Sequence, residues 1–285
     1  MKNFKKWFAY TLYVIGLVLF FLYVCFPEDS FTRYIENLAA RAAPGLETSV
    51  DGLGPGLPPS MSAKNIAIRY RGSESVLLES LKVTPRYLDF FIGKPFFNIS
   101  TEAAEGLIKG RLGIKDAFGN PQISLQMKLN GLRMETFAPV FKEISSHAVE
   151  GGFEGKIEYS GPFNLKGTGE AVFGLGEGAM RLTPPFYGID KIEFSQAQAQ
   201  MEMKNRNVTI SDFSLNGRQF SLKGNGRIIL SFPVEESRVN VSARVTPHAA
   251  LRKSLGDFLP SKYKRRNEIP MRITGTIGRP NVSIR

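Results

Sequence analysis

The side chains that most often carry acid–base, nucleophilic or metal chemistry are scarce in this sequence. It has two histidines, His147 and His248, which lie 101 residues apart, and a single cysteine, Cys25. Neither histidine lies near a G-x-S-x-G elbow or a cysteine nucleophile, so a surface or helix-end role is favoured over a catalytic base. The sequence contains no H-E-x-x-H motif, Cys/His cluster or acidic metal loop. We therefore predict that the protein is not an enzyme and has no catalytic residue, metal site or cofactor.

Two glycine-rich segments, Gly167–Gly169 and Gly174–Gly178, have the composition of loops that bind phosphate. Such a loop must open a helix whose N–H groups and dipole face the phosphate. The residues that follow, from Met180 to Pro185, end in two prolines and cannot form that helix. We interpret these glycines as hairpin turns or bulges.

A long apolar segment begins at Trp7 and ends at Phe26, twenty residues without a charge. At about 1.5 Å of rise per residue, a helix of that length spans about 30 Å, the thickness of a bilayer's hydrocarbon core. Three lysines precede it and two acidic residues follow it, so the positive-inside rule predicts a cytoplasmic tail at residues 1–6 and a transmembrane helix at residues 7–26. The residues expected along the span include Trp7, Tyr10, Ile15, Phe20, Tyr23 and Phe26.

A cleaved signal peptide is the alternative for this segment. The apolar run is longer than a signal peptide's core and no small-x-small cleavage site follows it, which favours an uncleaved anchor. The residues before Cys25 are too bulky for lipid attachment at that cysteine, so we expect a thiol buried inside the apolar helix. The remainder of the chain then contains no cysteine and must be stabilised by its hydrophobic core, without disulfides.

The basic run near the C-terminus contains four candidate contact residues. The formal net charge is +11, and ten Lys and Arg against two acidic residues fall between Arg244 and Arg285. The predicted orientation of the anchor puts this run outside the cytoplasm, which excludes nucleic acid as its partner. A contact with anionic headgroups or an acidic partner, and a solvated loop, both remain open. The candidate patch consists of Lys262, Lys264, Arg265 and Arg266.

Residues 27–45 are predicted to form an amphipathic helix and linker. Apolar residues from Phe31 to Ala42 recur at helical spacing, and Pro44-Gly45 ends the pattern. This helix either lies on a membrane surface or packs on the domain that follows, and the second is favoured. Gly52–Pro59 is too rich in proline and glycine for a helix or strand and is predicted to be an ordered turn segment.

From residue 46 to residue 285 the pattern is typical of a β-rich domain. Apolar and polar residues alternate in short runs, as in Ile123–Leu129, and glycine, asparagine or proline separates the runs. We predict a mainly β, antiparallel domain, either a curled sheet or a sandwich, with a few short helices. A strand, a helical turn and a glycine-containing strand recur three times, around 86–92, 136–144 and 247–259, which suggests weak internal repeats of a sheet with crossover connections.

Taken together, these features resemble the N component of bacterial type II secretion systems. The residues that carry the resemblance are the anchor ending in Phe26-Pro27, the helix beyond it, Gly54–Pro59 and the closing segment Ile273–Val282. The closing segment and the Thr84-Pro85 and Thr246-Pro247 junctions also resemble AsmA-like envelope proteins, which share an inner-membrane anchor and a β-rich periplasmic body.

The resemblance implies a single-pass protein of the bacterial inner membrane, with its N-terminus in the cytoplasm and its β-domain in the periplasm. As a type II secretion component it would be a structural or interaction subunit in the export of folded proteins across the outer membrane. Its partners would be other secretion components, in the inner-membrane platform or the outer-membrane channel, and membrane lipid through the anchor, with no nucleic acid. The AsmA-like alternative is a protein that binds or transfers lipid through an apolar β-groove. The 22 phenylalanines, including Phe90-Phe91 and Phe96-Phe97, motivate that alternative, although an ordinary core would also use them.

Overall fold

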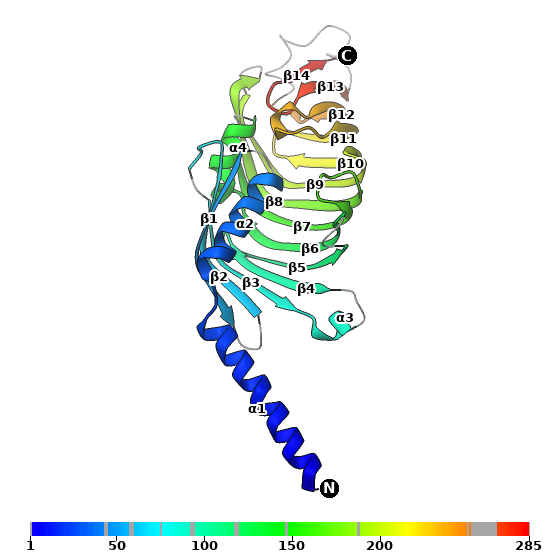
Figure 1. The fold of residues 1–285 in the computed structure, drawn as a ribbon. Coiled ribbons are helices and arrows are strands. Elements are labelled where there is room, and N and C mark those ends of the chain that lie inside the picture. Colours follow the sequence, from blue (N-terminus) through cyan, green and yellow to red (C-terminus); the bar gives the residue numbers. More distant parts are fainter. Residues whose placement is uncertain are drawn as a thin grey trace.

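The computed structural model describes residues 2–42, 45–56, 60–74, 76–91, 95–116, 120–145, 148–186, 189–249, 251 and 267–284. Two helices come first, α1 (Lys2–Val24) and α2 (Glu28–Ala42), and the rest of the described chain is mainly β (Figure 1). Shorter helical segments are α3 (Tyr87–Phe91), η1 (Met134–Phe137), α4 (Ala138–Ser145) and η2 (Val234–Glu236).

All the described strands belong to one sheet of fourteen. They are β1 (Leu46–Gly56), β2 (Ser60–Tyr70), β3 (Val76–Pro85), β4 (Phe96–Ala103), β5 (Gly106–Lys115), β6 (Gln122–Arg133), β7 (Ala148–Pro162), β8 (Thr168–Phe186), β9 (Ile189–Lys204), β10 (Asn207–Gly217), β11 (Phe220–Ile229), β12 (Arg238–Pro247), β13 (Ile269–Thr276) and β14 (Pro280–Ile284).

The strands follow one another across the sheet in chain order, and every neighbouring pair is antiparallel. This confirms the mainly β, antiparallel class, and a single curled sheet replaces the sandwich alternative (Figure 1). The predicted crossover connections are wrong, because α3 and α4 only join strands that already lie side by side. Both helical segments fall where the sequence predicted them, around 86–92 and 136–144, whereas most of 247–259 lies outside the described residues.

The prediction that Gly52–Pro59 is a turn segment is wrong for its first half, which belongs to β1. The pairing of β1 with β2 shifts register twice around Gly52 and Gly54, so the strand continues through the glycines. Gly52 takes a φ of +62°, which favours a residue without a side chain. Pro55 is tolerated because β1 is the first strand of the sheet and has a strand partner on one side only. Residues 57–59 lie outside the described part of the chain.

Helix α1 extends away from the sheet (Figure 1), and the large apolar side chains that the structure describes along it are exposed. Trp7 is 77% exposed and Tyr23 is 54% exposed. Across the parts of the chain that the structure describes, no helix combines the length and the apolar character that crossing a membrane requires. The structure thus confirms a helix over most of residues 7–26 and does not show the membrane span predicted there.

The core of the domain forms where the two N-terminal helices meet the sheet. Val50, Leu53, Ala63 and Ile66 form a buried cluster on β1 and β2, and Phe26 from the α1–α2 junction packs against it. Helix α2 packs against β1, so the prediction that this amphipathic helix lies on the β-domain is confirmed. This cluster fixes the N-terminal helices to one end of the sheet.

Candidate functional site

The strand registers align apolar residues into continuous rows on one face of the sheet, which we call the apolar face. The first row crosses thirteen strands, from β2 to β14, without a polar side chain. It consists of Met61, Val83, Ile99, Gly110, Met127, Ile157, Ala171, Met201, Ile210, Gly226, Val241, Ile273 and Val282. A parallel row runs from Ala63 to Ile284 with Thr101 as its one polar member, a third from Pro85 to Pro280, and a fourth from Leu132 to Ile269.

The apolar face is only partly buried. In the first row, Ile210 at 7% exposure and Val241 at 6% are buried, and the other eleven residues keep part of their surface accessible. In a filled sandwich, the inward side chains of central strands would be buried, because a second layer would pack on them. Among the described residues, the helices make their main contacts with β1, β2 and β7 only. The face therefore lacks a covering layer over most of its length.

The phenylalanines also argue against a filled core. Among the described residues, Phe194 and Phe220 are the buried ones. Phe97 lies in the third row of the apolar face and Phe153 stacks on Phe173 within the face, with ring centroids 5.4 Å apart. The side chains of Phe90 and Phe91 are outside the described part.

Contacts between distant strands show how strongly the sheet curls. The hydroxyl of Tyr70, at the end of β2, donates to Oε2 of Glu235 in η2 at 2.7 Å, and Arg71 forms an ion pair with the same carboxylate. In a flat sheet β2 and β11, the strands that precede these residues in the chain, would lie roughly 40 Å apart, at about 4.8 Å per strand. Tyr70 alternates with Ile66 and Ile68 on the apolar side of β2, so that side faces the inside of the curl. We call these three residues, Tyr70, Arg71 and Glu235, the clasp.

Partial burial and mutual contact shift the pKa values of Tyr70 and Glu235 in the clasp. Burial, followed by the hydrogen bond to Glu235, raises the pKa of Tyr70. Burial acts to raise the pKa of Glu235 as well, but the Tyr70 hydroxyl, a backbone amide and Arg71 outweigh it, so the pKa of that carboxyl is lowered. The turn at Gly278 completes the junction, since a Cβ there would lie 3.0 Å from the Glu235 side chain and 3.5 Å from the carbonyl oxygen of Ile144.

These pKa directions predict how the clasp depends on pH. A carboxyl whose folded pKa is lowered contributes stability above its unfolded pKa, near 4.5, and loses it as the pH falls through the folded pKa. A tyrosine whose folded pKa is raised contributes below its unfolded pKa, 10.0, and loses that contribution at higher pH. We expect Glu235→Gln to lower the Tm at pH 7 by more than it lowers the Tm at pH 3, measured by thermal unfolding. The exposed neighbour Glu236→Gln is the control, and an equal effect of Glu235→Gln at both pH values would contradict the prediction.

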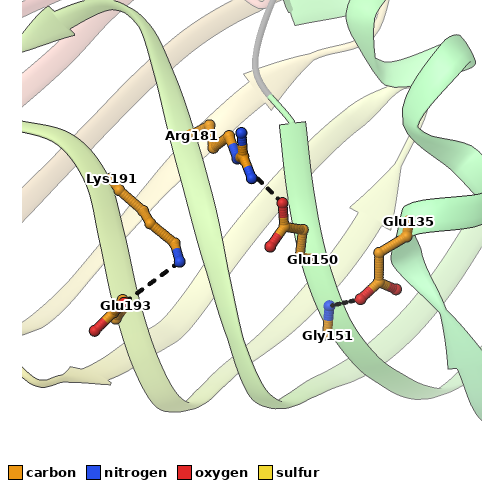
Figure 2. A network of polar contacts seen from close by, with 6 residues as sticks. All are labelled: Glu135, Glu150, Gly151, Arg181, Lys191 and Glu193. Atoms are coloured by element: carbon orange, nitrogen blue, oxygen red, sulfur yellow. Dashed lines mark hydrogen bonds and ion pairs between the residues drawn. The ribbon is translucent and has the colours of Figure 1, made fainter.

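Ion pairs occupy the ends of the middle strands, outside the apolar rows (Figure 2). Arg181 on β8 bonds Glu150 on β7 at 3.1 Å, and Lys191 lies 3.3 Å from Glu193 on β9. The amide of Gly151 donates to Glu135 in η1 at 3.1 Å, which ties η1 to β7. These side chains are at least one-third exposed, so each pair adds little stability. They place charged side chains beside the apolar face, near the start of β7 and β9 and toward the end of β8.

The opposite face of the sheet is polar. Its residues alternate with those of the apolar face and are mostly exposed, as for Lys128, Lys156 and Gln200. A shallow cavity of about 440 Å³ lies over β6 to β10, and most of its lining residues belong to this polar face, with Val172 as its exposed apolar member. This cavity is therefore distinct from the apolar face.

The residues singled out from the sequence do not meet in one site. Trp7, Tyr10, Phe20 and Tyr23 are exposed along α1, Ile15 belongs to α1 but its side chain is outside the described residues, and Phe26 packs on the core cluster. The basic patch of Lys262, Lys264, Arg265 and Arg266 lies outside the described part of the chain, as does His147. His248 is exposed and lies 3.0 Å from the carbonyl of Arg218. Cys25, expected to be buried inside the apolar helix, is exposed just after α1 ends.

Sequence reasoning missed the residues that define the site. Alternation in single strands such as β6 signalled a one-sided sheet, but which residues align across thirteen strands depends on registers that a single strand does not encode. No group of three or more potential metal ligands forms among the described residues. A comparison of the chain with protein-family models, with curated proteins and with solved structures found no match.

Proposed function

We propose that this chain is a non-enzymatic, membrane-attached envelope protein that holds lipid acyl chains along the apolar face of its curled sheet. The observation that carries the proposal is the first row of the apolar face, which is unbroken across thirteen strands and is only partly buried. Such a surface is costly in water, and an apolar ligand is the occupant whose chemistry matches it. The proposal is the AsmA-like reading of the sequence.

The dimensions of the face suit acyl chains. Fourteen strands at about 4.8 Å give a contour of roughly 60 Å, and four rows of side chains give a width of roughly 20 Å. Each CH₂ group that leaves water contributes about 0.8 kcal/mol, so even one chain that lies along a few strands gains several kcal/mol. Burial of existing side chains competes little for this surface, since the described helices make their main contacts with the strands named above.

Helix α1 supports the membrane part of the proposal. Its exposed apolar side chains, such as Trp7 and Tyr10, need a cover that the sheet does not provide, and lipid is a suitable one. The three lysines before it and the two acids after it favour a cytoplasmic N-terminus and a sheet on the periplasmic side of a bacterial inner membrane. Attachment next to a bilayer would give the apolar face direct access to its ligand.

Native mass spectrometry of the full chain, released gently from detergent, tests the proposed function. We expect phospholipid adducts that persist after the micelle is removed, and organic extraction of the purified protein should recover the same lipids. Protein that carries detergent alone in both measurements would contradict lipid binding.

The second candidate function is the secretion-system subunit that the sequence resembles. The observation that favours it is the edge position of β14, which pairs with β13 alone among the described strands, because an edge strand is a natural template for a partner's strand. In this reading the sheet binds other type II secretion components. Crosslinking in the envelope followed by pull-down should recover platform or channel proteins, and recovery of none would remove this candidate.

A further inference from the structure

The polar face carries two ladders of like charge on neighbouring strands. Lys109, Lys128 and Lys156 lie directly opposite one another on β5, β6 and β7, and we call them the basic ladder. Two residues further along β7, Glu158 begins an acidic ladder that continues through Glu170 on β8 and Glu202 on β9. From β7, the basic ladder therefore extends across the sheet to β5, and the acidic ladder extends the other way to β9.

This arrangement is unfavourable within one chain. Like charges directly opposite each other on adjacent strands destabilise a sheet, by up to about 1 kcal/mol per pair. Lys156 and Glu158 form the single ion pair within the ladders, and in the described chain the other four residues make no ion pair. A sheet stabilised only by itself would place opposite charges across each strand pair. The ladders thus point to a partner that supplies the missing charges.

The geometry points to a second copy of this chain as that partner, bound by the polar face about a two-fold axis parallel to β7. Rotation about this axis places β5 of one copy over β9 of the other and β6 over β8. Strand β7 lies over its own copy, where Lys156 and Glu158 are already paired with each other within each chain at 2.5 Å. Lys109 then faces Glu202 of the second copy, and Lys128 faces its Glu170. The two rows are offset along the strands by roughly 7 Å, the spacing of residues i and i+2, which a lysine side chain can bridge. Each contact occurs twice, as in any isologous interface.

A partner of one charge sign fits this surface less well. An anionic membrane or nucleic acid would be attracted by the basic ladder and repelled by the acidic one, which starts on the same strand. A basic partner would meet the reverse problem. Only a surface that carries both ladders in the matching order neutralises both, and this chain has one. Because the charges are exposed, the association is expected to be weak and to decrease as salt is raised.

The test uses the full chain in detergent with Cys25→Ser, one new cysteine and a short bis-maleimide crosslinker. Ser160→Cys is exposed on the polar face of β7, on the proposed axis, and is expected to crosslink to its own copy. Thr209→Cys, on the polar face of β10, would lie roughly 29 Å from its own copy at about 4.8 Å per strand, and is the control that measures random encounters in the micelle.

Charge reversals in the Ser160→Cys background test whether the two ladders hold the copies together. Lys128→Glu and Glu170→Lys are each expected to reduce crosslinking at least fivefold. The double reversal should restore it, because positions 128 and 170 of the two copies are again opposite in sign. Each single reversal also relieves a like-charge ladder within the chain, so its Tm should not fall. Two results would overturn the proposal. One is a crosslinking yield for Ser160→Cys, with no charge reversed, that is no higher than the yield for Thr209→Cys. The other is a double reversal that crosslinks no better than either single reversal.

Discussion

Met201→Glu is expected to remove at least nine-tenths of the lipid that co-purifies with the wild-type protein. Met201 lies in the middle of the first apolar row, between Ala171 on β8 and Ile210 on β10. It is partly exposed, so the carboxylate stays hydrated in the free protein and the fold survives. An acyl chain laid over it would have to strip that hydration, which costs several kcal/mol without a partner. Phosphorus or mass-spectrometric quantification of bound lipid per protein measures the effect.

The matched control for this substitution is the adjacent residue on the same strand. Gln200→Glu adds the same charge to β9, but Gln200 is exposed on the polar face. Bound lipid should therefore stay at the wild-type level. Equal losses in the two variants would show that added charge, and not the apolar face, controls lipid content.

Leu53→Ala is expected to destabilise the domain by about 2–5 kcal/mol, the range for deleting a buried leucine side chain. Leu53 is 3% exposed and belongs to the cluster against which Phe26 packs. The cavity would therefore weaken both the first strands and the attachment of the N-terminal helices to the sheet. Urea unfolding of the full chain, followed by circular dichroism of the strands, gives the free energy of unfolding.

Leu77→Ala provides the comparison, because Leu77 is also a strand leucine but is 56% exposed on β3. Its loss should change the free energy of unfolding by less than about 0.5 kcal/mol. A Leu53→Ala effect no larger than that of Leu77→Ala would mean that this cluster is not the core of the domain.

The sequence predicted the local structure of this chain better than the way its strands pair into one sheet. The alternation in Ile123–Leu129 was confirmed, since Leu125 and Met127 lie on the apolar face and Lys128 on the polar face of β6. The turn prediction for Gly52–Gly56 failed because bulges let an edge strand accommodate glycine and proline. Propensity describes isolated segments and does not include such register shifts.

The curl of the sheet and the clasp could not be predicted from the sequence. Tyr70 and Glu235 are separated by 165 positions, and nothing in either local sequence marks the other as its partner. The same limit applies to the ladders on the polar face, where three lysines from separate strands align only through two registers. For this reason lipid binding, which was the alternative on sequence grounds, is now proposed ahead of the secretion-system subunit. An open apolar face, which the sequence left undecided against a filled sandwich, favours lipid binding over a purely structural role.

The central claim is that acyl chains lie on the apolar face, and photo-crosslinking tests it most directly. The full chain would be reconstituted with a phospholipid that carries a photoactivatable group within its acyl chain, irradiated, and mapped by peptide mass spectrometry. We predict labels on partly exposed apolar-face residues far from α1, such as Met127, Ile157 and Met201. Labels confined to α1, or shared equally by polar-face residues such as Gln126 and Gln200, would contradict the account.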